Sequence, residues 1–306
     1  MPELPEVEVV RRGIEPYSAG WRVEHVEVFD DRALTRHDGP TEDFVAGLVG
    51  REFLAAVRRG KFLWLPLSDT RDRHGEALVC HLGMSGQVLL GDHPEQFGPL
   101  LRVALELSGP GGQEITWGFV DQRLFGSLAI DQMVETQPGV AAGRGSDESR
   151  IPSQVAHIAR DLLDPAHDDA AVARMIRRKS SGIKRVLLDQ QVTSGVGNIY
   201  ADEALFASRL HYDYPANRLS QSRALELLGA VRDVFGRALE DGGTSFDWQY
   251  VNVNGQSGYF SQSLHAYGQD GTPCRRCGRI IVREPFMNRS SFRCPRCQPR
   301  PRKRVG

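Results

Sequence analysis

The chain has 306 residues, enough for two ordinary domains that each bury a core of their own. Its composition is 40% hydrophobic and 25% charged, with no apolar run long enough to cross a bilayer, which excludes a membrane-spanning protein. The first residues lack the basic and apolar regions of a secretory signal, so we expect a cytoplasmic protein. A formal net charge of -1 argues neither for nor against a nucleic-acid partner.

The first predicted element is a helix that begins within MPELPEVEVVRRG. Four apolar residues have helical spacing and are predicted to face the core: Leu4, Val7, Val10 and Ile14. Glu3 and Glu6 are three residues apart and therefore share one helix face. Proline and glutamate are also favoured at an ordinary helix start, by the fixed φ of proline and by the helix dipole.

The same stretch has a chemical interpretation. Removal of Met1 would leave Pro2 as a secondary amine at the chain terminus. Such an amine titrates near 8, so an appreciable fraction is neutral and can attack an electrophilic carbon to give an iminium. The carboxyl of Glu3 or Glu6 could then move a proton beside it. From these residues alone, the structural and the catalytic interpretations both stay open.

Strands are predicted next, from about residue 53 to residue 130. Short apolar runs alternate with Gly, Pro and Asp clusters, and the clearest are residues 62–67, 77–83, 101–107 and 114–119. Cys80 lies in one of these runs and is predicted to be a small buried side chain. The stretch 133–152 is rich in Gly, Ser and acidic residues, and we expect it to be a linker between domains.

Helical periodicity follows the expected linker. The predicted helices are residues 170–178, 183–191, 201–210 and 222–243, and the last ends at a Gly242-Gly243 pair typical of a helix C-terminus. The sequence therefore predicts an α+β multidomain protein with a β-rich N-terminal domain and a helical domain after it.

The C-terminal segment combines cysteines with positive charge. Two Cys-x2-Cys pairs are separated by sixteen residues, a spacing that indicates one tetrahedral zinc held by Cys274, Cys277, Cys294 and Cys297. Disulfides are a weaker interpretation for a chain that otherwise looks cytosolic. Residues 271–306 carry eleven Arg and Lys and one Glu, which favours contact with a polyanion over a merely solubilising tail.

A resemblance connects these features. In order along the chain, the segments MPELPEVE, RRGKFL, HLGMSG, DQRLFG, IKRVLLDQ, GVGNIYADEALF, NGQSGYF and NRSSFRCPRCQ resemble motifs of the formamidopyrimidine-DNA glycosylase family. The resemblance implies an N-terminal β-sandwich flanked by helices (1–132), the linker (133–152), a helical helix-two-turn-helix domain (153–262), a zinc-finger β-hairpin (263–298) and a basic tail (299–306).

The resemblance also implies catalytic roles for four residues. Pro2 would be the nucleophile at C1′ of the damaged nucleotide, and Glu3 the acid that assists opening of the sugar ring. Glu6 would lie in the same pocket in a supporting role. Lys61 would hold a phosphate near the lesion, although a hairpin lysine is more often a solvated charge.

Six further positions would contact DNA. Met84, Arg123 and Phe125 match the set that fills the gap left by an everted base, with Met84 at a turn tip and the other two on the same side of an extended segment. A core Met, a core Phe and a surface Arg are the alternatives. The residues expected to contact phosphate are Lys184, Asn198 and Arg289, of which Asn198 could instead cap a helix. The loop NGQSGYF would close over the everted base.

The implied activity is that of a bifunctional DNA glycosylase and AP lyase in base excision repair, with one structural zinc. Its partner would be double-stranded DNA that contains oxidised purines (8-oxoguanine, formamidopyrimidines) or abasic sites, and the chain would act as a monomer, cytoplasmic and nucleoid-associated when bound to DNA. An endonuclease VIII-like glycosylase for oxidised pyrimidines is an alternative, against which Leu4 and the complete set of three void-filling residues argue. A non-catalytic damaged-DNA-binding paralogue is the third, against which the intact N-terminus and zinc ligands argue.

Overall fold

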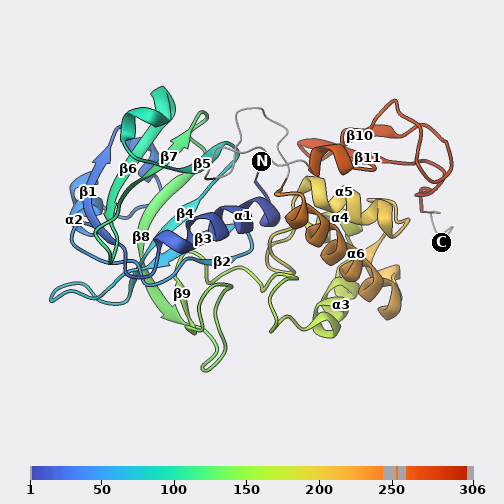
Figure 1. The fold of residues 1–306 in the computed structure, drawn as a ribbon. Coiled ribbons are helices and arrows are strands. Elements are labelled where there is room, and N and C mark those ends of the chain that lie inside the picture. The colour runs from blue at the N-terminus through green and yellow to red at the C-terminus, as the bar shows by residue number, and fades with distance from the viewer. Residues whose placement is uncertain (1, 244–252, 254–259, 302–306) are drawn as a thin grey trace. The chain divides into compact units, whose positions relative to one another are not determined.

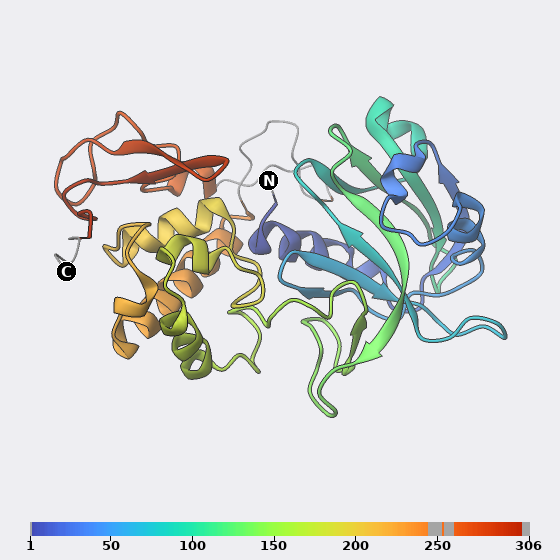
Figure 2. The same ribbon diagram turned by 180° about the vertical axis from the view of Figure 1, so that it is seen from behind.

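The computed structural model of the chain describes residues 2–243, 253 and 260–301. The chain forms two compact units: unit 1 comprises residues 1–157 and 242–258, and unit 2 comprises residues 158–241 and 259–306. Figure 1 and, from behind, Figure 2 show most of the strands in unit 1, and helices α3 to α6 with the β10–β11 hairpin in unit 2. The predicted α+β class, with a β-rich domain followed by a helical domain and a terminal hairpin, is confirmed.

Unit 1 contains an antiparallel β-sandwich. One sheet has the strand order β1-β6-β7-β5 and the other β2-β3-β4-β8-β9. The strands are β1 Arg22–Val28, β2 Val57–Arg59, β3 Phe62–Pro66, β4 Glu76–His81, β5 Gly86–Gly91, β6 Leu101–Ser108, β7 Glu114–Asp121, β8 Ser127–Glu135 and β9 Arg150–Pro152. One hydrophobic cluster takes Val103 and Phe119 from the first sheet and Leu63 and Leu78 from the second. The shared core makes the two sheets a sandwich, as the resemblance implied.

The four clearest strand predictions correspond to β3, β4, β6 and β7. The strand β1, by contrast, lies before the region in which strands were expected. Its buried residues Val23 and Val26 are three apart, because a register shift between Val23 and His25 interrupts the alternation of a regular strand. Because of the bulge, β1 lacks the alternation of buried and exposed residues by which strands are predicted from sequence.

The expected linker at 133–152 differs in the structure. The strand β8 continues to Glu135 and pairs with β9, so that Met133 lies opposite Pro152 and Glu135 opposite Arg150. The polar stretch between these strands is thus the connection of a hairpin that adds an edge strand to the second sheet. Unit 1 extends to His157.

Two helices belong to unit 1, α1 (Leu4–Ile14) and α2 (Thr41–Ala46). The four apolar residues predicted for the inner face of α1 are at most 1% exposed. Three of them, Val7, Val10 and Ile14, belong to the sandwich cluster. The buried apolar face therefore fixes the first helix of the chain to the core.

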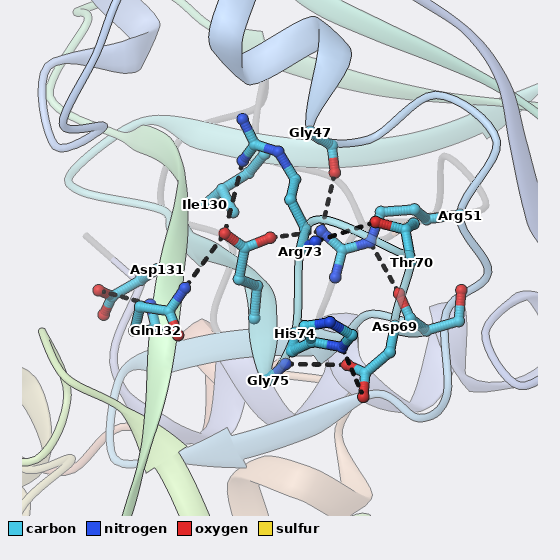
Figure 3. Close-up of polar contacts among 12 residues, drawn as sticks. Gly47, Arg51, Asp69, Thr70, Arg73, His74, Gly75, Ile130, Asp131 and Gln132 are labelled. Atoms are coloured by element: carbon cyan, nitrogen blue, oxygen red, sulfur yellow. Dashed lines mark hydrogen bonds and ion pairs between the residues drawn. The ribbon is translucent and has the colours of Figure 1, made fainter.

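Arg51, which is buried, and the half-buried Arg73 stabilise the end of the second sheet that is drawn in Figure 3. Arg51 is 1% exposed and donates from Nη1 to Glu76 Oε2 at 2.5 Å and to the carbonyl of Gly47 at 3.1 Å. Glu76 Oε1 also accepts from Arg73 at 3.4 Å and from Gln132 at 3.2 Å. Because a buried carboxylate is costly unless it is paired, this arrangement fixes the end of α2 and the start of β4 together.

Unit 2 contains the helices α3 (Asp169–Arg178), α4 (Ile183–Leu187), α5 (Asn198–Ala207) and α6 (Gln221–Glu240), and the hairpin of β10 (Val282–Phe286) and β11 (Arg289–Arg293). All four helix predictions correspond to helices, although α4 ends earlier and α5 begins earlier than expected. Gly242 follows α6 with a φ of 74°, as expected of a glycine at a helix C-terminus. Among the described residues, no helix is both long and apolar enough to span a membrane.

Candidate active site and nucleic-acid interface

The candidate nucleophile immediately precedes α1. Pro2 is buried, and Glu3 and Glu6 are 1% and 3% exposed. Glu3 is the N-cap of the helix and forms a capping box with Glu6, in which the backbone N–H of Glu3 donates to Glu6 Oε2 at 2.9 Å. The two carboxyls thus stabilise the helix start and lie one and four residues from the candidate amine. The structural and the catalytic interpretations of this stretch are compatible.

A buried carboxylate on α1 connects the helix to the turn that carries Lys61. Glu8 accepts from Arg58 Nε at 2.8 Å and from Arg11 Nε at 3.2 Å. Arg58 also donates from Nη1 to the carbonyl of Gly60 at 3.1 Å, and Gly60 has a φ of 56° in the tight turn between β2 and β3. The side chain of Glu8 is completely buried. Burial alone would raise the pKa of Glu8, but the opposite effect of Arg58 and Arg11 is larger, so the pKa lies below its usual value. Glu8 therefore stays ionised and fixes the position of the Lys61 turn relative to α1.

The three candidate void-filling residues lie on two turns. Met84 is at the turn between β4 and β5, as predicted, and is 38% exposed. Arg123 is exposed and Phe125 is 56% exposed, in the connection between β7 and β8. The expectation that this connection is extended is wrong, because the chain bends there and Leu124 has a φ of 55°. A core position for Met84 and Phe125 is also ruled out, since large apolar side chains in a core are not exposed to this extent.

Two of the three candidate phosphate contacts of unit 2, Asn198 and Lys184, lie at one carbonyl. Asn198 Nδ2 donates to the carbonyl of Ser290 at 3.0 Å, and Lys184 Nζ lies 3.4 Å from the same oxygen. Asn198 is the first residue of α5, and its side chain does not cap the helix, since Gly197 occupies the N-cap position. Arg289 is exposed at the start of β11, beside the hairpin turn. Among the described residues, Asn198 Oδ1 has no hydrogen-bond partner.

The position of Lys184 differs from a simple phosphate contact. Its side chain is 0% exposed, and its ammonium donates to Asp202 Oδ1 at 2.7 Å. Burial raises the pKa of Asp202 to about 6, although Lys184 counteracts this shift. Asp202 also accepts from Ser291 Oγ at 2.7 Å and from the backbone N–H of Phe292 at 3.0 Å. In this structure, the ammonium of Lys184 therefore pairs with Asp202 inside unit 2, and this pair helps fix β11 to α5.

The neighbouring carboxylate on α5 binds the segment that precedes the zinc hairpin. Glu203 accepts from three successive backbone N–H groups, those of His265, Ala266 and Tyr267, at 2.8–3.0 Å. Asp202 and Glu203 are thus successive residues of one helix, and they bind the stretches that precede the second and the first pair of cysteines.

The four predicted zinc ligands converge. Their Sγ atoms all lie within 4.8 Å of one another. The separation is 3.5 Å between Cys277 and Cys294 and 4.0 Å between Cys274 and Cys297, far above a disulfide bond of about 2.05 Å. A tetrahedral zinc with Zn–S bonds of about 2.3 Å requires sulfur atoms about 3.8 Å apart. The cluster therefore fits one zinc ion with four thiolate ligands and no open position, which is a structural site.

Residues 254–259 of the expected lesion-capping loop lie outside the described part of the chain. The last residue of that motif, Phe260, is described and stacks on Tyr200 of α5 at a centroid distance of 5.8 Å. It belongs to the core of unit 2, where it is 0% exposed.

Several residues that shape the two sites were not predicted: Glu8, Arg58, Ser85, Asp121, Asp202 and Glu203. All of them lie inside the motifs that carry the family resemblance. For Asp202 and Glu203 the signal was a pair of charged side chains in an otherwise apolar helix, which favours a buried and paired position.

Comparisons with known proteins agree with this geometry. The chain matches three family models: the formamidopyrimidine-DNA glycosylase N-terminal domain over residues 1–128, the helix-two-turn-helix (H2TH) domain of the same enzymes over residues 158–249, and a zinc finger found in FPG and IleRS over residues 271–300. It is 58% identical to the formamidopyrimidine-DNA glycosylase of Leifsonia xyli subsp. xyli over 97% of this chain and 99% of the relative. The chain belongs to the formamidopyrimidine-DNA glycosylase family.

Further relatives support the family assignment over the full length. The formamidopyrimidine-DNA glycosylase of Thermobifida fusca is 51% identical over 99% of each chain. Among solved structures, the MutM (Fpg) protein of Thermus thermophilus is similar with a TM-score of 0.77 and 33% identity, covering 97% of this chain and 98% of that chain. A structure of MutM in complex with DNA that contains carbocyclic 8-oxo-G is similar with a TM-score of 0.79 and 26% identity, over 98% of this chain and 100% of that chain.

Proposed function

We propose that this chain is the bifunctional DNA glycosylase and AP lyase of base excision repair that excises 8-oxoguanine and formamidopyrimidines from double-stranded DNA. The observation that carries the proposal is the start of the chain, where Pro2 precedes a helix whose first turn holds two buried carboxyls, in a protein 58% identical to a formamidopyrimidine-DNA glycosylase over nearly its whole length. The related MutM bound to 8-oxo-G DNA supports the same substrate class.

The proposed chemistry uses the chain terminus. After removal of Met1, the neutral nitrogen of Pro2 attacks C1′ of the damaged nucleotide, the bond between C1′ and the base breaks, and the departing base takes up the proton that the nitrogen loses. Glu3 donates a proton to the ring oxygen of the sugar, so that the ring opens and an iminium forms between Pro2 and C1′. The iminium acidifies the adjacent sugar protons, and successive β- and δ-elimination release the strand on both sides of the lesion.

The remaining proposed roles concern DNA. Lys61 holds a phosphate beside the lesion, and Met84, Arg123 and Phe125 fill the space left by the everted nucleotide. Asn198 and Arg289 contact phosphates from unit 2, with Arg289 held at the end of the zinc-stabilised hairpin. The void-filling role is consistent with the exposure of two large apolar side chains at turns, where they can insert between bases.

The test is reductive trapping of the covalent intermediate. A processed, zinc-loaded chain incubated with an 8-oxoguanine duplex and borohydride is expected to form a protein–DNA adduct and, without borohydride, to cut the strand. Pro2→Gly, or a tag fused before Met1, is expected to reduce both products strongly, whereas the same tag at the C-terminus is the matched control. Full cutting and trapping with the N-terminal tag in place would refute Pro2 as the nucleophile.

The alternatives are separated in the same assay. An endonuclease VIII-like enzyme would excise thymine glycol in preference to 8-oxoguanine opposite cytosine, and a binding-only paralogue would retard lesion DNA in a gel without cutting it. We further infer that the chain acts as a monomer in the cytoplasm, on nucleoid DNA. Sedimentation of the complex with a short duplex tests the monomer.

A further inference from the structure

The two turns that carry the candidate void-filling residues share one buried carboxylate. Asp121, the last residue of β7, is 0% exposed. Its Oδ1 accepts from Ser85 Oγ at 2.5 Å and from the backbone N–H of Arg123 at 3.0 Å, and its Oδ2 accepts from the backbone N–H of Gly126 at 2.8 Å. Ser85 directly follows Met84. One side chain therefore connects the Met84 turn to both ends of the Arg123–Phe125 bend.

The backbones of the two turns are also in direct contact. Gly83 has a φ of 60°, and a Cβ at this position would lie 2.3 Å from the carbonyl carbon and oxygen of Phe125. Such a separation is far below van der Waals contact, so no side chain fits between the turns. The backbone positions of Met84 and Phe125 are consequently set by the same packed unit.

A carboxylate suits this position for a chemical reason. It is an acceptor at both oxygens, and three donors point at it, two of them backbone N–H groups that cannot be changed by substitution. An asparagine would offer only one acceptor oxygen, and its NH2 group would face a donor. Because Asp121 is buried, these three hydrogen bonds supply the partners that its carboxyl oxygens need away from water.

We propose that Asp121 and Ser85 are positioning residues for the void-filling set, which they hold in the geometry needed to enter the base stack. The inference rests on the proposed function, and it deepens that function by adding two residues that do not touch the substrate. Insertion of a wedge must offset the loss of base stacking, so a wedge on loosened turns would insert less often.

The test compares substrates that do and do not require the wedge. Ser85→Ala and Asp121→Asn are measured in the full, processed, zinc-loaded chain by single-turnover excision of 8-oxoguanine opposite cytosine. Borohydride trapping on a single-stranded abasic oligonucleotide, which has no base stack to fill, is measured in parallel. A loss of about tenfold or more is expected on the duplex, as for removal of a hydrogen bond to a charged group, and less than about twofold on the single strand.

Two further variants separate positioning from damage to the fold. Ser85→Thr keeps the hydroxyl and is expected to recover most of the duplex activity that Ser85→Ala loses. Ser127→Ala is the matched control, because Ser127 is a buried serine two residues beyond Phe125 whose Oγ has no hydrogen-bond partner among the described residues. A 2-aminopurine placed beside the lesion reports insertion directly, since its fluorescence rises when it is unstacked.

The outcomes are distinct. A selective loss on duplex DNA, with a smaller 2-aminopurine signal and rescue by threonine, supports the inference. Equal losses on both substrates, or no loss in Ser85→Ala and Asp121→Asn, would overturn it. A wild-type chain that forms no adduct on either substrate would instead overturn the proposed function itself.

Discussion

Replacing Glu8 with glutamine tests how α1 is fixed to the sandwich. The carboxylate is completely buried and lies 2.8–3.2 Å from nitrogens of four arginines: Arg11, Arg12, Arg58 and Arg144. Arg58 is completely buried as well, so Glu8→Gln removes the carboxylate charge that its guanidinium contacts at 2.8 Å inside the protein. Removal of one member of a buried ion pair costs about 3–5 kcal/mol, which lowers the midpoint of thermal unfolding by roughly 6–20 °C for a folding unit of the size of unit 1.

The matched control is Glu15→Gln. Glu15 binds the same Arg11 at 2.8 Å, but its side chain is 53% exposed, so the change in stability should stay below about 1 kcal/mol. The assay is chemical and thermal unfolding followed by circular dichroism, together with borohydride trapping at a temperature where both variants are folded. Trapping should also fall in Glu8→Gln, since Arg58 fixes the turn that carries Lys61.

The pH dependence of this difference has a definite sign. Because the pKa of Glu8 is lowered in the folded protein, its stabilising effect is present above its usual pKa of 4.5 and is lost as the pH falls through the folded value. Wild type and Glu8→Gln should therefore approach each other in stability below pH 4.5. A variant that is as stable as wild type at pH 7 would refute the buried-pair reasoning.

The other predictions concern single side chains. Arg289→Ala should weaken DNA binding and reduce the slope of log K against log salt by about one unit without changing the unfolding midpoint, and an unchanged slope would remove Arg289 from the interface. Burial lowers the pKa of His81 from 6.5 to about 4. As the pH falls from 6.5 to 4, the His81 imidazole is therefore protonated in the unfolded chain but not in the folded one, and the free energy of unfolding should decrease. In urea titrations, His81→Asn should reduce this dependence of the unfolding free energy on pH. Lys184→Met should destabilise unit 2 by about 3 kcal/mol because Asp202 loses its cation, whereas a normal midpoint with weaker DNA binding would return Lys184 to the phosphate contacts.

Local pattern was sufficient for much of the fold. The apolar spacing of α1 predicted its buried face, and the two Cys-x2-Cys pairs predicted a cluster that the structure brings together. The turn at Met84 followed from the glycines beside it, since Gly83 requires a positive φ. Each of these predictions depends on residues close in sequence, whose geometry the chain determines locally.

The structural features that the sequence did not predict depend mostly on residues far apart in the chain. Lys184 is buried because Asp202, eighteen residues later, supplies its charge partner, and nothing within its own motif indicates this. Ser85 and Asp121 are 36 residues apart and meet only because β5 pairs with β7 in register. The bend at Leu124 is imposed by the hydrogen bonds on either side of it, which override the extended preference of the segment.

The adjacent carboxylates of α5 have a consequence for metal exchange. Asp202 and Glu203 tether residues 291–292 and 265–267, which precede the second and the first cysteine turn respectively, through hydrogen bonds in which the metal takes no part. A chelator that removes the ion would release both cysteine turns, while the chain just before each turn stays attached to the helix. Reloading is then a local closure over a short loop, for which the entropy cost is small.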